Sequence, residues 1–103
     1  MSDLNRNSLK VQHDSAKREF FIEIPGCKER AFLSYEPLGG RVVDLQHTVV
    51  PETFRGRGMG KLLAQAALQE MAAENMQMRL TCWYLKKFVE ENPSEEYSNR
   101  IIP

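Results

Sequence analysis

The sequence has little of what stabilises secreted proteins and anchors membrane proteins. Its 103 residues contain only two cysteines, Cys27 and Cys82, and neither a C-x-x-C nor an H-E-x-x-H spacing occurs. This argues against a disulfide framework and against the common zinc sites. No apolar run of about 18 residues is present, and the N-terminus lacks the apolar stretch of a secretory signal. We therefore expect a cytoplasmic protein with reduced thiols, of a size that permits passage into the nucleus.

An excess of charge of either sign is also absent. The 14 Lys and Arg residues balance the 14 Asp and Glu residues, so the formal net charge is zero. We therefore expect no general attraction to nucleic acid or to a membrane, and any anion site has to be local. With 42% hydrophobic and 27% charged residues, the composition is typical of an ordinary globular domain. The length allows only one domain, expected as a monomer or weak dimer.

Short segments of alternating polarity fill the N-terminal half and favour strands. Turn pairs at Pro25-Gly26 and Gly39-Gly40 separate them at hairpin-like intervals. The predicted strands span residues 10–13, 19–24, 30–35 and 41–50. This spacing is typical of an antiparallel meander. Residues 1–8 are polar and are predicted to form a flexible tail, so the folded domain spans residues 9–103.

The C-terminal half changes to helical periodicity. Residues 58–74 are rich in strong helix formers, and their apolar members recur every three or four positions. This predicts an amphipathic helix that ends near Asn75 in left-handed geometry. Residues 78–84 follow as a strand, and a short helix over residues 85–91 ends before Pro93. We therefore predict an α+β fold with a mixed, mainly antiparallel sheet, one parallel β-α-β crossover and a short C-terminal helix.

Three alternating glycines, Gly56, Gly58 and Gly60, stand where the longest predicted strand passes into the helix. Glycine permits positive φ and close approach of a ligand, and the first N–H groups of a helix have no internal partner. Because the helix N-terminus is also electropositive, a phosphate or pyrophosphate is the expected ligand. Three basic side chains add mobile cations around it: Arg55, Arg57 and Lys61.

The better-known phosphate motifs do not fit this loop. A P-loop would need Gly at Arg55 and Ser or Thr at Leu62, and a dinucleotide fingerprint would need Gly at Lys61 or at Leu63. A glycine turn that only connects strand and helix is one alternative. Contact with nucleic-acid phosphate is another, which the zero net charge and the lack of a wider basic stripe disfavour.

The pattern Arg55-x-x-Gly58-x-Gly60 resembles the Q/R-x-x-G-x-G/A signature of the GNAT superfamily of acetyl-coenzyme A-dependent N-acetyltransferases. The surrounding segments extend the resemblance to the small, single-domain N-acetyltransferase domain-containing members over about residues 11–97. These segments are DLQHT at 44–48, Val50-Pro51, LTCWY at 80–84 and ENP at 91–93. The resemblance implies transfer of an acetyl group from acetyl-coenzyme A to a primary amine of a small molecule or protein.

In that family the loop holds the coenzyme A pyrophosphate, and backbone of the preceding strand holds pantetheine. The resemblance therefore implies acetyl-coenzyme A as the cofactor, with these binding residues: Thr48, Val49, Val50, Arg55, Gly56, Arg57, Gly58, Met59, Gly60, Lys61 and Asn92. A free N–H on the strand would also polarise the thioester carbonyl. Asn92 serves equally well as a plain helix stop before Pro93.

Acetyl transfer needs one group to take the amine proton and another to protonate the departing thiolate. His47, near the end of the first crossover strand, is the predicted general base, with an imidazole that only holds strand geometry as the alternative. Strand alternation puts Asp44 and His47 on opposite faces unless a bulge intervenes. On the second strand, Cys82 is either a reacting thiol or a small buried side chain, and Tyr84 on the same face is a candidate proton donor.

A second hypothesis is a non-catalytic module that binds coenzyme A or a protein. Larger members of the family carry additional N-terminal helices and a C-terminal strand region that build the acceptor pocket, and this chain is too short for them. The expected partners are acetyl-coenzyme A and an amine acceptor, with no metal, nucleic acid or membrane. Direct attack of the amine in a ternary complex is favoured over a route through acetylated Cys82, which would need an exposed, activated thiol.

Overall fold

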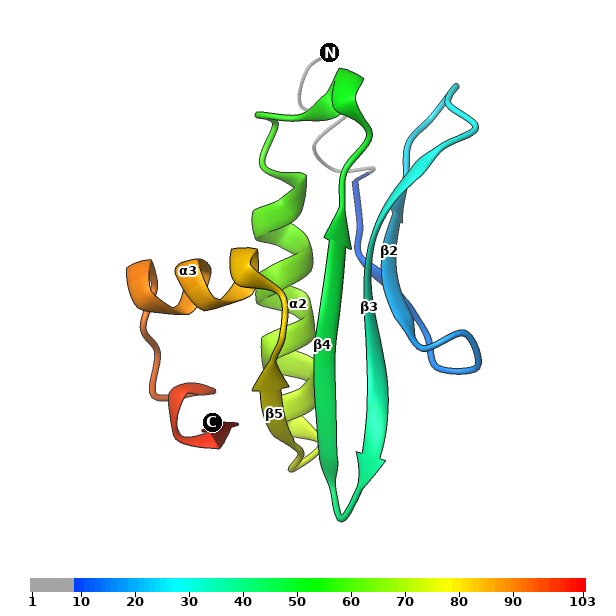
Figure 1. Cartoon of the computed structure of the whole chain (residues 1–103). Helices are drawn as coiled ribbons and strands as arrows, with labels where there is room; N and C mark the ends of the chain where they lie inside the picture. The colour runs from blue at the N-terminus through cyan, green and yellow to red at the C-terminus, as the bar shows by residue number, and fades with distance from the viewer. Residues whose placement is uncertain (1–8) are drawn as a thin grey trace.

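The structure, a computed structural model, describes residues 9–103 as a six-stranded sheet that runs in chain order from β1 to β6 (Figure 1). The predicted tail at residues 1–8 lies outside this range. The strands are β1 (Gln12–Asp14), β2 (Glu19–Glu23), β3 (Arg30–Gly39), β4 (Val42–Val49), β5 (Gln77–Leu80) and β6 (Ile101–Ile102). The helices are α2 (Met59–Ala73) and α3 (Trp83–Glu91), with short 3-10 turns η1 (Glu52–Phe54) and η2 (Ser98–Arg100). Within residues 9–103, neither helix has the length and apolarity of a membrane span.

The sheet is mixed, as the sequence predicts. Strands β1 to β4 pair antiparallel, whereas β4 pairs parallel with β5 and β5 pairs parallel with β6. Helix α2 connects β4 to β5 and lies behind them in Figure 1. Asn75 ends this crossover helix with a φ of 64°, the predicted left-handed geometry. The α+β fold with one helical crossover is therefore confirmed.

The core lies between α2 and one face of the sheet. The helix buries side chains at three- and four-residue intervals: Met59, Leu63, Ala64, Ala67, Leu68 and Met71. Alternate strand residues face them, among them Phe20, Ile22, Leu33, Leu45 and Met78. The same alternation directs Phe21, Phe32 and Val49 to the opposite face, where they are half-buried or exposed. One sheet face is therefore core, and the other presents apolar side chains at the surface.

The predicted strand over residues 78–84 is wrong in its second half. The N–H groups of Thr81 and Cys82 both donate to the Leu45 carbonyl, at 3.0 and 3.1 Å, so the parallel ladder stops at Leu80. The Cys82 carbonyl then accepts hydrogen bonds from Leu85 and Lys86 and starts α3. Cys82 is thus the N-cap of α3, and the expectation that it shares a strand face with Tyr84 is wrong.

Other boundaries differ less. Strand β3 continues to Gly39, four residues beyond the predicted end at residue 35, because it keeps pairing with β4 through an irregularity at Pro37. The sequence predicted no strand near the C-terminus. Ile101 and Ile102 form β6 because they pair in parallel with Met78 and Arg79 at the edge of β5 that β4 leaves unpaired.

A pair of glutamates lies near β1, one in α2 and the other at the C-cap of that helix. Glu70 and Glu74 are one helical turn apart, and Nδ1 of His13 lies 3.9 Å from Oε2 of Glu70. A hydrogen bond with Glu70, aided by desolvation and by the Glu70 charge, raises the pKa of Glu74, while His13 and Arg41 oppose the rise. The folded state therefore holds a proton on Glu74 more tightly than the unfolded chain does. This stabilisation is present at acidic pH and is lost as the pH rises through the raised pKa.

We expect Glu74→Gln to stabilise the protein at pH 8 and to have no effect at pH 4. Like charges one helical turn apart cost about 0.2–0.5 kcal/mol, which corresponds to roughly 1–3 °C in Tm for a domain of this size. Thermal unfolding followed by circular dichroism measures the shift. Glu95→Gln is the control because it removes an exposed carboxylate outside this pair. An equal shift of Tm at both pH values would contradict the prediction.

Candidate functional site

The glycine-rich loop holds an array of backbone N–H groups without partners. Gly56 and Gly58 have φ values of 84° and 82°, in the left-handed region. The first helical hydrogen bond runs from the Leu62 N–H to the Gly58 carbonyl at 3.0 Å. Within residues 9–103, the N–H groups of residues 56–61 have no acceptor. The loop and the first turn of α2 thus present several donors at an electropositive helix end.

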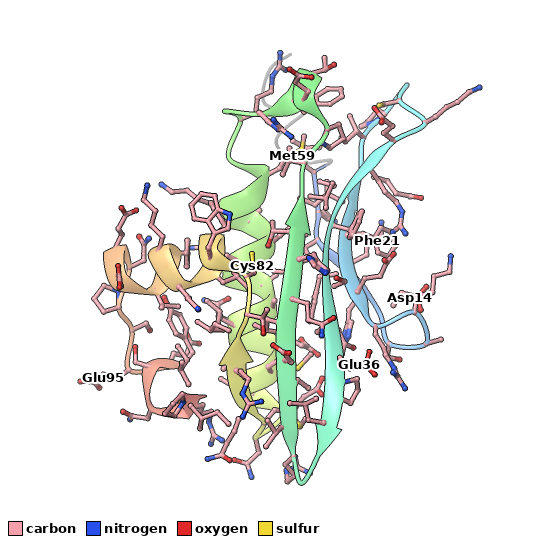
Figure 2. The ribbon with its side chains drawn as sticks, viewed as in Figure 1. Asp14, Phe21, Glu36, Met59, Cys82 and Glu95 are labelled. Carbon is pink, nitrogen blue, oxygen red and sulfur yellow. The ribbon has the colours of Figure 1, made fainter. Side chains whose placement is uncertain are left out.

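These donors lie at one end of a cleft of about 820 Å³ between β4, the loop and the start of α3. Figure 2 shows Met59 at the loop end of α2 and Cys82 at the junction of β5 and α3. The cleft exists because β4 and β5 separate: their pairing ends at Leu45 and Leu80, yet β4 continues to Val49. Beyond Leu45, β4 pairs with β3 only, so its other edge is open to a ligand.

All but two of the predicted cofactor-binding residues line this cleft. Those that do are residues 48–50, 55, 56 and 58–61. Arg57 does not, and its guanidinium lies 5.8 Å from the centre of the Phe54 ring. Asn92 does not either, because its side-chain amide donates to the Phe88 carbonyl at 3.0 Å and its own carbonyl accepts from the Tyr97 hydroxyl. The geometry favours the helix-stop role for Asn92.

Cys82 and Tyr84 both line the cleft, although they come from the N-terminus of α3 rather than from a strand. Cys82 is 8% exposed, and its sulfur lies 3.5 Å from Oγ1 of Thr48. Burial, followed by the effects of Cys82 and Glu91, raises the pKa of Tyr84 above its usual value of 10.0. The phenol therefore keeps its proton at neutral pH and can donate it. A Cβ on Gly60 would lie 3.0 Å from this hydroxyl, so glycine permits the close approach.

His47 faces a second, outer cleft of about 550 Å³ rather than the first one. A bulge places it there: Ser34 pairs with His47 and Tyr35 with Leu45, leaving Gln46 as an extra residue in β4. The bulge puts Asp44 on the same face as His47, the exception that the sequence analysis allowed. The Asp44 carboxylate nevertheless accepts hydrogen bonds from Oγ1 of Thr81 at 2.6 Å and Nε2 of Gln46 at 3.4 Å, not from His47.

The two clefts meet at the gap between β4 and α3. They share the lining residues Thr48, Val49, Cys82 and Trp83. The first cleft includes the glycine loop, whereas Phe32 and His47 line only the second cleft and lie on the sheet face opposite α2. Two ligands bound in the two clefts would therefore meet beside Cys82.

Comparison with known proteins agrees with this geometry. The family model of the GCN5-related N-acetyl-transferases matches residues 19–100. The chain belongs to this family. Its members generally use acetyl-coenzyme A, and the unpaired amides at the loop suit the pyrophosphate of that cofactor.

Relatives from vertebrates are similar to this chain in sequence over most of their length. Protein NATD1 of Xenopus tropicalis is 47% identical over 97 residues, which cover 94% of this chain and 89% of the relative. The human Protein NATD1 is 48% identical over 95 residues, with coverage of 92% and 84%. The solution structure of a GCN5-like protein from Staphylococcus aureus superposes with a TM-score of 0.69 at 20% identity, covering 92% of this chain and 89% of the other. That last likeness concerns the fold alone.

Two residues that line the first cleft, Phe54 and Trp83, were not among the site residues predicted from the sequence. Phe54 closes the first cleft beside Arg55, and Trp83 lies between both clefts with 72% of its surface exposed. This exposure places Trp83 at the rim of the clefts. An aromatic residue directly before the loop signature could have indicated Phe54. No local signal indicates Trp83, because its position depends on where β5 ends.

Proposed function

We propose that the chain binds acetyl-coenzyme A in the first cleft and transfers the acetyl group to a primary amine. The unpaired N–H groups of residues 56–61 at the end of that cleft carry the proposal. A pyrophosphate presents several negatively charged oxygens, and backbone amides at a helix N-terminus bind such a group well. Arg55 and Lys61 line the same cleft and add positive charge. Nε of Arg55 also donates to the Val50 carbonyl at 3.3 Å and ties the loop to β4.

The open edge of β4 would hold the pantetheine arm. Residues 48–50 line the cleft beyond the last parallel pair at Leu45, so their backbone groups on this side have no neighbouring strand. The cofactor supplies an acetyl group activated as a thioester. A β4 N–H directed at the thioester oxygen would stabilise negative charge that develops there during attack.

The two clefts divide the proton transfers between two side chains. His47 lines only the outer cleft and would take the proton of an amine arriving there, whereas Tyr84 lines only the first cleft and would protonate the departing sulfur. In this direct transfer the amine nitrogen bonds to the acetyl carbon as the carbon–sulfur bond breaks. Tyr84 then regains its proton from solvent. In this proposal the proton acceptor lies in the cleft of the amine, and the proton donor lies in the cleft of the thioester.

Calorimetric titration with coenzyme A, followed by transfer assays against a panel of amines, tests the proposal. Micromolar or tighter binding with turnover of at least one amine is expected. Binding without turnover of any amine would instead support the non-catalytic coenzyme A module. Absence of binding would refute the site itself, and an oligonucleotide complex that coenzyme A does not displace would favour the nucleic-acid alternative.

Cys82 offers a sharper test of the direct route, because its side chain lines both clefts and contacts Thr48. We expect Cys82→Ala to lower kcat about fivefold through loss of this hydrogen-bonding contact, which is worth roughly 1 kcal/mol, while coenzyme A affinity stays unchanged. Steady-state kinetics and calorimetry measure the two quantities.

Cys82→Ser is the matched variant because a hydroxyl keeps the contact with Thr48 but is a far weaker nucleophile than a thiol. Activity close to wild type is expected for Cys82→Ser. Loss of transfer in both variants would instead support an acetylated Cys82 intermediate. An unchanged rate in Cys82→Ala would leave Cys82 with a packing role only.

A further inference from the structure

The outer cleft is lined by apolar side chains and by a few polar ones. Phe32, Val49 and Trp83 supply its apolar surface, and Val49 and Trp83 are 43% and 72% exposed. Its remaining lining side chains are amide, hydroxyl, thiol and imidazole groups. In the described part of the chain, no Asp, Glu, Lys or Arg lines this cleft. Exposed apolar surface of this kind on a small domain marks a place for an apolar ligand.

The charged groups nearest the cleft are already engaged. Asp44 accepts hydrogen bonds from Thr81 and Gln46, two lining residues, and its own carboxylate does not line the cleft. The Arg30 guanidinium is paired with Glu19 and lies 5.9 Å from the centre of the Phe32 ring. A second cation on the ligand would find no carboxylate among the described lining residues to balance it. The electrostatics thus disfavour a polycation.

We propose that the acceptor is a monoamine carried on an apolar or aromatic group and bound as the neutral free base in the outer cleft. This inference rests on the proposed acetyl transfer. The ring or chain of such an amine would pack between Phe32, Val49 and Trp83, and its nitrogen would point to the gap beside Cys82. An ammonium ion entering an apolar cleft without a carboxylate loses hydration that nothing replaces, so the cleft selects the unprotonated amine. Only that form has the lone pair needed for attack.

A matched pair of acceptors tests the proposal: 2-phenylethylamine, an aromatic monoamine, and spermidine, a polycation. At pH 8 and saturating acetyl-coenzyme A, we expect kcat/KM for 2-phenylethylamine to exceed that for spermidine at least tenfold. We expect Phe32→Ala to lower kcat/KM for 2-phenylethylamine about tenfold, mainly through KM, because truncation removes apolar contact with the ring. Coenzyme A affinity should not change, since Phe32 lines only the outer cleft.

Trp83 provides a readout that does not depend on turnover, because it is the only tryptophan in the chain. With coenzyme A present, 2-phenylethylamine should change its fluorescence saturably, and spermidine should not at equal concentration. Phe32→Asp should reverse this order by placing a carboxylate in the cleft. Equal or stronger binding or turnover of spermidine by the wild type would overturn the inference, as would a lack of any saturable change with 2-phenylethylamine. If coenzyme A still binds and at least one amine is still acetylated in either case, the proposed function stands and only the acceptor class is wrong.

Discussion

Gly58→Val should abolish measurable coenzyme A binding while the sheet stays folded. Gly58 has a φ of 82°, which a β-branched residue adopts only under strain, and its αL geometry turns the loop into the first turn of α2. A return to negative φ would swing the amides of residues 56–61 apart. Loss of two charge-assisted hydrogen bonds costs about 3–6 kcal/mol, so an affinity loss of about 100-fold or more is expected in calorimetric titration.

Gly26→Val is the matched control for the backbone strain that a valine with positive φ introduces. Gly26 has a φ of 75°, and a Cβ added there would meet no atom within 4 Å, as is also true of Gly58. It lies in the turn between β2 and β3, outside both clefts. Both variants should lose several degrees in Tm, because left-handed geometry costs a non-glycine residue about 1–3 kcal/mol. Only Gly58→Val should lose coenzyme A binding, and equal affinity in that variant would refute the amide array as the binding site.

Tyr84→Phe should lower kcat about 100-fold and leave coenzyme A affinity within about twofold. The change removes only the hydroxyl proton donor, and loss of general acid catalysis typically costs about 10²–10⁴ in rate. Burial raises the pKa of Tyr84 above 10.0, so the donor stays protonated across the neutral and mildly alkaline range. Since the protonated form is the one required, titration of Tyr84 should not reduce the wild-type rate as the pH rises from 6 to 9. Rate measurements over that pH range check both statements.

Tyr97→Phe is the control for the loss of a buried phenol. Burial also raises the pKa of Tyr97, but its hydroxyl donates to the Asn92 carbonyl and lies outside the first cleft. This variant should lose stability by about 1 kcal/mol and keep its transfer rate. A rate loss of similar size in both variants would show that Tyr84 acts through stability or packing rather than by giving a proton.

The candidate site was predictable where it depends on local chain chemistry. The three glycines, the basic residues beside them and the helix that follows are adjacent in sequence, so residues 48–61 alone predicted the loop and most lining residues of the first cleft. Two of the predicted cofactor-binding residues, Arg57 in the loop and Asn92 after α3, do not line the first cleft. The Arg57 guanidinium lies near the Phe54 ring, and the Asn92 side-chain amide donates to the Phe88 carbonyl at the end of α3. The local sequence does not predict either contact.

The placement of the candidate catalytic groups was not predictable in the same way. Residues 80–84 have strong strand propensity, but the Leu45 carbonyl takes both following amides and ends the ladder, so Cys82 and Tyr84 belong to the start of α3. Similarly, the unequal pairing of β3 and β4 inserts Gln46 as a bulge and turns His47 to the outer face. Both outcomes depend on which strand lies alongside, and no window of the sequence contains that information.

The sequence by itself determined the fold class, the crossover helix and the glycine-rich loop. These follow from periodicity, glycine conformation and unpaired helix amides, all of which act over a few residues. Only the tertiary structure decided that β4 continues beyond its last pair with β5. It also decided that two clefts meet beside Cys82 and that the exposed Trp83 lines both of them. The physical reason is that strand ends and registers are set by hydrogen bonds between segments far apart in the chain.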